Sequence, residues 1–177
     1  MDSWNKLNLL NPRELREIQN NKLRFFLSRQ IYPFSPYYRK LFDQLRIKPE
    51  YIKTVEDLKI IPFTKKDDFL PTKENPRRFV DFILHPDESL IKKYWPKHKL
   101  LQMLLLKAFK GDEYLKGRLQ KEYRPIFLTA TTGTTNQPVS FLYTDYDIEN
   151  LRISGYRLLE IFAGKGDIRA VNIFPYA

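Results

Sequence analysis

Residues 126–144 read IFLTATTGTTNQPVSFLYT, and this stretch decides the fold class of the chain. Two short apolar runs, 126–128 and 139–143, have the composition of buried strands, and a threonine-rich loop joins them. Thr144 can cap the helix that follows, and residues 168–174 form a third strand-like run. The apolar face of that helix would consist of Ile148, Leu151, Gly155, Leu158, Leu159 and Phe162. The order strand, loop, strand, helix, strand predicts the beginning of an α/β layer.

The loop between the two predicted strands is rich in hydrogen-bond donors. Residues 129–138 hold five threonines, and Gly133 can adopt a positive φ angle without steric cost. Successive backbone N–H groups in such a loop can form a nest for an anion, as glycine-rich loops do for phosphate. The spacing differs from G-x-x-x-x-G-K-[ST], which excludes a Walker A loop. A threonine-rich β-turn without a ligand is the structural alternative.

Residues 1–70 are predicted to form an N-terminal helical region without strands. Asn11, Pro12 and Glu14 have the order of a helix start with a capping box, and apolar residues then follow at helical spacing. We expect Pro33 to end this helix. Further helix starts are predicted at Ser35-Pro36, at Thr54 with Asp57, and at Thr64 with Asp67.

Residues 71–125 are predicted to form a proline-rich insertion followed by a basic helical hairpin. The insertion carries prolines that prevent any long helix or strand, namely Pro71, Pro76, Pro86 and Pro96. Residues 97–121 have the pattern of two helices with a turn at Gly111. The lysines of 92–121 form either a solvated helical face or a surface for a polyanion such as coenzyme A or RNA.

Composition and charge exclude several classes of protein. The chain has no cysteine, which excludes disulfides, thiolate metal sites and cysteine nucleophiles, and its two histidines predict no metal site. No apolar run approaches the roughly 18 residues of a membrane span, and the first residues lack the order of a signal peptide. We therefore predict a cytoplasmic protein without a membrane partner. The net charge of +10 favours a polyanionic partner such as a nucleotide or coenzyme, although residues 127–177 carry a net charge of −1.

An ordered set of segments carries a resemblance to a known family. Thr131-Thr132-Gly133-Thr134-Thr135-Asn136-Gln137-Pro138 resembles the phosphate loop T-S-G-T-T-G-x-P, with Asn136 in place of the usual glycine. The other segments are Ser35-Pro36-Tyr37-Tyr38-Arg39, Glu56-Asp57-Leu58, the stretch IPFTKKDD at 61–68, Tyr143-Thr144-Asp145-Tyr146-Asp147, Gly164-Lys165-Gly166-Asp167 and Asn172-Ile173-Phe174-Pro175-Tyr176. In this order they resemble adenylate-forming enzymes, in particular the branch of phenylacetate-CoA ligase and coenzyme F390 synthetase.

The resemblance implies the N-terminal part of an adenylate-forming enzyme fold, with residues 126–177 as the first part of its α/β adenylation domain. The parent enzyme would join ATP and a carboxylic acid into an acyl-adenylate with Mg²⁺ on the phosphates, and would then pass the acyl group to a thiol, expected to be coenzyme A. The resemblance assigns ATP phosphate binding to Thr131, Thr132, Gly133, Thr134, Thr135 and Asn136. Lys66 matches a family lysine and is either a phosphate contact or a solvated lysine. Phe174 and Tyr176 line the acyl pocket or belong to strand core.

The family's catalytic residues correspond to segments beyond residue 177, so the resemblance implies that this chain alone is inactive. Its expected partners are the remainder of the adenylation enzyme and a small carboxylic acid, and a homodimer is a further expectation. The alternative is a basic, aromatic-rich module that binds nucleic acid or another polyanion without catalysis. The helical core spacing of most aromatic residues argues against that alternative.

Overall fold

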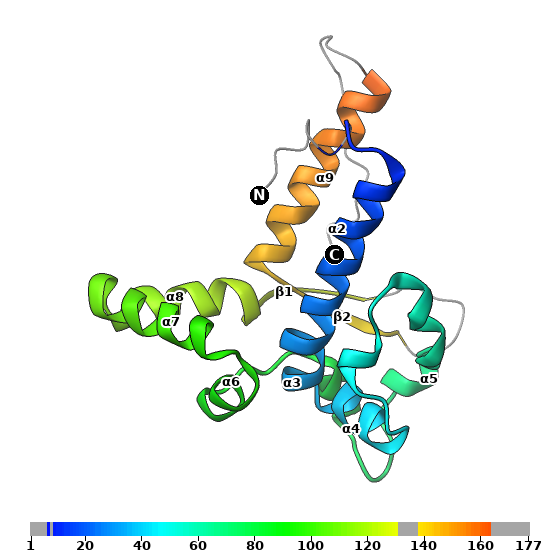
Figure 1. Ribbon diagram of the computed structural model, residues 1–177. Coiled ribbons are helices and arrows are strands. Elements are labelled where there is room, and N and C mark those ends of the chain that lie inside the picture. Colours follow the sequence, from blue (N-terminus) through cyan, green and yellow to red (C-terminus); the bar gives the residue numbers. More distant parts are fainter. Residues whose placement is uncertain (1–6, 8, 131–137, 164–177) are drawn as a thin grey trace.

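The computed structural model describes residues 7, 9–130 and 138–163 (Figure 1). Helices form the front and the middle of this part of the chain, and a two-stranded sheet and one long helix follow. The predicted helical front, helical hairpin, first two strands and following helix are confirmed. The predicted third strand at 168–174 lies outside the described residues, so the α/β layer stays a prediction.

The first helical run begins where the sequence predicts. Helix α2 (Pro12–Phe26) has a capping box, in which the Asn11 side chain accepts from the Glu14 backbone N–H and the Glu14 carboxylate accepts from the Asn11 N–H, both at 3.0 Å. The run continues through the π-turn η1 (Leu27–Ile31) into α3 (Tyr32–Phe34) without leaving helical geometry.

The expectation that Pro33 ends the helix is wrong, because Pro33 lies inside α3 and the run ends after Phe34. A proline has no N–H for the carbonyl one turn earlier, which here belongs to Arg29. Trp95 supplies the missing donor, since its indole Nε1 donates to the Arg29 carbonyl at 3.1 Å. In return, the Arg29 guanidinium donates to the Tyr94 carbonyl at 2.6 Å. A contact from a distant segment therefore compensates the proline.

Short helices complete the front: α4 (Pro36–Gln44), η2 (Pro49–Tyr51), η3 (Val55–Ile60), α5 (Lys66–Phe69) and η4 (Arg78–Phe82). The predicted cap of η3 is confirmed, because the Asp57 carboxylate accepts from the Thr54 N–H at 2.9 Å. The predicted cap of α5 is wrong by one residue. There, Asp68 accepts from the Lys65 N–H at 2.8 Å.

Two small hydrophobic cores hold these helices together. Leu27, Phe42 and Ile52 form the first core, and Phe34, Ile91 and Tyr123 form the second. The continuous run from η1 to α3 contributes Leu27 to one core and Phe34 to the other. This run is therefore the element that joins the N-terminal helices to the middle of the chain.

The middle of the chain consists of α6 (Glu88–Tyr94), α7 (Lys97–Lys110) and α8 (Asp112–Tyr123). Helices α7 and α8 pack as a hairpin, and Gly111 between them has a φ of 85°, which an L side chain rarely adopts. Figure 1 shows this hairpin projecting to one side of α2, with α5 on the other side.

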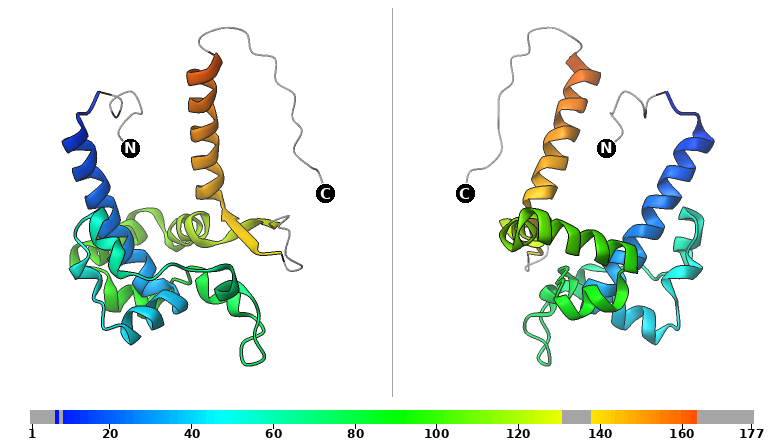
Figure 2. Two further views of the ribbon diagram at one scale, coloured as in Figure 1. Left: turned by 90° about the vertical axis from the view of Figure 1, so that its right-hand side faces the viewer. Right: turned by 60° about the vertical axis from the view of Figure 1, so that its left-hand side comes forward.

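Strands β1 (Pro125–Ala130) and β2 (Ser140–Thr144) form an antiparallel pair, and α9 (Asp145–Ala163) follows β2 directly. Figure 2 shows α9 and α2 as two separate arms that rise from the same side of the molecule. The predicted apolar face of α9 has no covering element among the described residues, since Leu151 is 54% exposed and Phe162 is 80% exposed.

Candidate functional site

The structure describes the frame of the predicted phosphate loop. The loop residues Thr131, Thr132, Gly133, Thr134, Thr135 and Asn136, and the acyl-pocket candidates Phe174 and Tyr176, lie outside the described residues. Ala130 and Ser140 are partners in the antiparallel ladder, so the two ends of the loop lie side by side. Val139, directly before β2, is buried and anchors the returning end. The hairpin therefore brings both ends of the donor-rich segment to one place.

The segment after β2 is also organised as the motif Y-T-x-x-D suggests. The Asp147 carboxylate accepts from both the backbone N–H and the hydroxyl of Thr144 at 2.9 Å, and the Asp147 N–H donates to the Thr144 hydroxyl at 3.2 Å. This capping box ends the strand and starts α9 within one residue. The two motif residues therefore set the angle between the hairpin and the helix.

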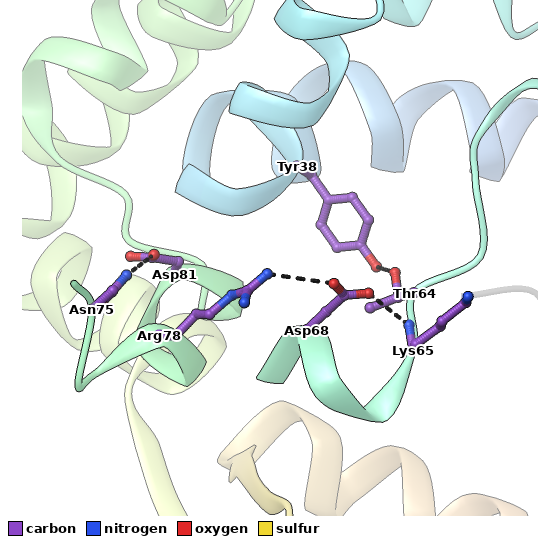
Figure 3. A network of polar contacts seen from close by, with 7 residues as sticks. All are labelled: Tyr38, Thr64, Lys65, Asp68, Asn75, Arg78 and Asp81. Carbon is purple, nitrogen blue, oxygen red and sulfur yellow. Dashed lines mark hydrogen bonds and ion pairs between the residues drawn. The ribbon is translucent and has the colours of Figure 1, made fainter. Parts of the chain in front are cut away.

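Lys66 is the first residue of α5, and polar contacts from α4 and η4 hold this short helix and the residues directly before it (Figure 3). The Tyr38 hydroxyl of α4 bonds the Thr64 hydroxyl at 3.0 Å. Asp68 also pairs with Arg78 of η4 at 3.4 Å, so the carboxylate that caps α5 connects the helix to η4 as well. The segments resembling S-P-x-Y-R and P-F-T-x-K-x-D thus contact each other directly.

A stack of aromatic rings supports α5 from the side of α4 and η4. The Phe82 ring stacks on Tyr37 at a centroid distance of 3.9 Å and on Phe69 at 4.1 Å. Burial, and next the nearby charge of Asp68, raise the pKa of Tyr37, so its phenol stays neutral at physiological pH. The stack gives α5 a rigid apolar wall.

A cavity of about 320 Å³ lies between this wall and the hairpin. Phe69, Phe79 and Phe82 line one side, and β2 and the start of α9 line the other. The polar lining consists of hydroxyl, amide and carboxylate groups, from Gln30, Glu122, Ser140, Thr144, Tyr146 and Asp147. Lys66 does not line the cavity, so the described residues do not bring it to the strand ends. The cavity is suited to an apolar group, and an anion would have to be held by the loop.

Sequence reasoning missed the wall formed by Tyr37, Phe82 and Phe69. Phe82 belongs to the apolar cluster that interrupts the proline-rich stretch, and this cluster was the available signal. Its partner in the fold could not be read from spacing, because the stack joins three segments far apart in the chain.

In the part of the chain that the structure describes, no three His, Asp or Glu side chains gather as a metal site. None of the described helices combines the length and the apolar composition that crossing a bilayer requires.

No family model matches the chain, and a comparison with curated proteins found a relative that is similar over part of its length. A stretch of 58 residues is 41% identical to phenylacetate-coenzyme A ligase from Thermus thermophilus. The match covers 32% of this chain and 13% of the ligase, so the chain spans only a small part of that relative's length. About a third of the chain is therefore similar to part of a protein named as a phenylacetate-coenzyme A ligase.

Proposed function

We propose that the protein to which this chain belongs is an ATP-dependent ligase that activates a carboxylic acid as acyl-AMP and transfers the acyl group to coenzyme A. The observation that carries this proposal is the frame of the loop. Strands β1 and β2 pair at Ala130 and Ser140, and the Thr144–Asp147 cap follows. The similarity to phenylacetate-coenzyme A ligase supports it over 58 residues.

The proposed role of the loop is to bind the triphosphate. Acyl-AMP forms when a carboxylate oxygen attacks the α-phosphorus and the bond to the pyrophosphate oxygen breaks, which leaves negative charge on pyrophosphate. Hydroxyl groups of Thr131, Thr132, Thr134 and Thr135 and backbone N–H groups near Gly133 would donate hydrogen bonds to the β- and γ-phosphates. Lys66 would add positive charge if the complete site brings α5 to the loop.

The described residues suit the apolar part of such a substrate better than its anionic part. The cavity beside β2 is walled by phenylalanines and has no cationic side chain in its lining. No metal cluster is present among the described residues, so the proposal assigns none of them to Mg²⁺. The proposed ligands of the complete protein are ATP, Mg²⁺ and coenzyme A, and its proposed fold is an α/β adenylation fold.

Binding of Mg²⁺-ATP to the complete protein tests the role of the loop. We expect the double variant T132V/T134V to weaken binding by roughly tenfold or more in calorimetric titration, because hydrogen bonds to charged groups contribute about 1.5–3 kcal/mol. The matched control is T129V, since Thr129 lies in β1 and valine suits a strand.

The two variants must differ for the proposal to stand. Equal affinity of T132V/T134V and T129V for Mg²⁺-ATP, or no ATP binding by the folded complete protein, would contradict it. Release of pyrophosphate by the complete protein, assayed with aryl and alkyl carboxylic acids, then identifies the acid.

A further inference from the structure

A second cavity, of about 470 Å³, lies between the π-turn η1, the end of α6 and the α7–α8 hairpin. This volume is within the range of small-molecule sites, roughly 300–1,000 Å³. Its apolar lining includes Trp95, Met103, Leu106, Leu115, Leu119 and Tyr123. It contains no residue of the β-hairpin or of α5, although Gln30, Glu122 and Tyr123 form a wall that it shares with the cavity beside β2.

The floor of this second cavity is preformed. The Trp95 indole is fixed by its hydrogen bond to the Arg29 carbonyl, and its ring and the Tyr123 ring both pack on Phe34. The Gln30 side chain donates to Glu122 at 2.9 Å and to the Tyr123 hydroxyl at 3.3 Å. Burial raises the pKa of Tyr123, so this phenol adds no negative charge. A ligand would find a rigid, apolar surface with few groups to reorganise.

Two cations that line the cavity have no ionic partner among the described residues. Lys99 of α7 and Arg118 of α8 both line it, and neither has an ion pair or side-chain hydrogen bond within the described part of the chain. Lys107 and Lys116, on the same two helices, both pair with Asp112. The single carboxylate in the lining, Glu122, accepts a hydrogen bond from Gln30. The lining therefore carries more positive than negative charge, with Arg29, Lys99 and Arg118 against the one carboxylate of Glu122.

We propose that this cavity binds an amphipathic organic anion, with its apolar body on Trp95, Met103 and Leu119 and its carboxylate or phosphate group at Lys99 and Arg118. Burial of the apolar body supplies affinity. Charge-assisted hydrogen bonds from the two cations select the anion over a neutral molecule of the same shape. The site goes beyond the proposed ligase reaction and requires no residue of the threonine-rich loop.

Emission from Trp95 reports directly on the cavity once the other tryptophan is removed by W4F. In the W4F chain, we expect decanoate to change the Trp95 emission saturably with a stoichiometry of one. Decanol should bind roughly tenfold more weakly, because it cannot pair with the cations. A parallel titration with decyl phosphate compares the two head groups. The anion that binds more tightly shows whether the site prefers a carboxylate or a phosphate. Equal affinity for decanoate and decanol, or no saturable change, would overturn the proposal.

Paired variants then test the two cations. In K99Q/R118Q we expect the affinity for decanoate to fall to that for decanol. The matched control K97Q/R124Q removes the same charges from residues that do not line the cavity, and decanoate binding should stay within about twofold. Equal losses in the two double variants would show non-specific attraction and would reject the site.

Filling the cavity is the second, independent test. In the W4F chain, M103F/L119F should abolish the Trp95 response to both decanoate and decanol, while circular dichroism and the unfolding midpoint verify that the variant folds. Unchanged decanoate binding by a folded M103F/L119F protein would reject the site. The affinity for Mg²⁺-ATP should be the same in K99Q/R118Q and in the parent chain, so failure of this proposal and failure of the ligase proposal are separable.

Discussion

At the scale of single residues, side chains form hydrogen bonds with backbone groups that have no partner within their own helix. Pro33 leaves the Arg29 carbonyl without its helical donor, and Trp95, 66 residues away in sequence, donates in its place. The caps Asn11–Glu14 and Thr144–Asp147 could be predicted, because their donors and acceptors lie three residues apart. The cap of α5 lies one residue from the predicted position, and its carboxylate also pairs with Arg78 outside the helix.

A double-mutant cycle tests whether Trp95 replaces the hydrogen-bond donor that Pro33 lacks. We expect W95F to lower the free energy of unfolding by about 1–3 kcal/mol, because it leaves a carbonyl of the helical run without its donor. In a P33A background the cost should be smaller, since the backbone N–H at position 33 can then donate to Arg29. Urea unfolding of the four proteins measures the coupling. If W95F lowers the free energy of unfolding equally in both backgrounds, Trp95 does not compensate for the proline.

At the scale of elements, helices and strands with strong local signals were predictable, and interruptions of the helical geometry were not. The α7–α8 hairpin was predicted from its apolar spacing and its glycine turn, and the structure places Gly111 between the two helices. The π-turn η1 has no local signal of this kind. It ends two residues before Pro33, and a distant tryptophan donates a hydrogen bond to its Arg29 carbonyl, so spacing alone predicts an ordinary helix there.

Two glycines of the hairpin should respond in opposite ways to the same substitution. G111A should destabilise the chain by about 1–3 kcal/mol, because the backbone conformation at φ 85° and ψ 166° is nearly restricted to glycine. G117A should stabilise it by up to about 1 kcal/mol, since Gly117 lies within α8 and an added Cβ meets nothing within 4 Å. Thermal unfolding of both variants provides the comparison. An unchanged or raised midpoint in G111A would show that a side chain fits the backbone conformation at this turn.

At the scale of the whole molecule, much apolar surface is uncovered. Several large hydrophobic side chains of α9 are more than half exposed, namely Leu151, Tyr156, Leu158, Ile161 and Phe162, and Ile126 and Leu128 of β1 are similar. Patches of this kind mark contacts with other protein surfaces or sites of association. The sequence predicted the apolar face of α9 from its spacing. It could not predict what packs on the face, because apolar spacing identifies one side of a helix and carries no information on the surface that meets it.

Charges placed on the face of α9 should reduce self-association without unfolding the chain. Leu151 and Leu158 are 54% and 56% exposed, so L151E/L158E should change the unfolding midpoint little. Sedimentation velocity over a range of concentrations should show less association than in the parent chain. R152E, on the same helix but already in an ion pair with Glu149, controls for the added charge. A large loss of stability in L151E/L158E would mean that the face is packed.

The π-turn also shifts the phase of the helical run. One extra residue in a turn rotates everything downstream by about 100° around the helix axis. In an uninterrupted helix, Phe34 would follow Leu27 and Ile31 along one stripe and would face the first core. With the turn, Leu27 and Phe34 point into different cores. Deleting one residue from η1 would restore a regular helix and aim Phe34 away from Tyr123 and Trp95. The one additional residue in η1 thus lets a single helical run place Leu27 in the first core and Phe34 in the second.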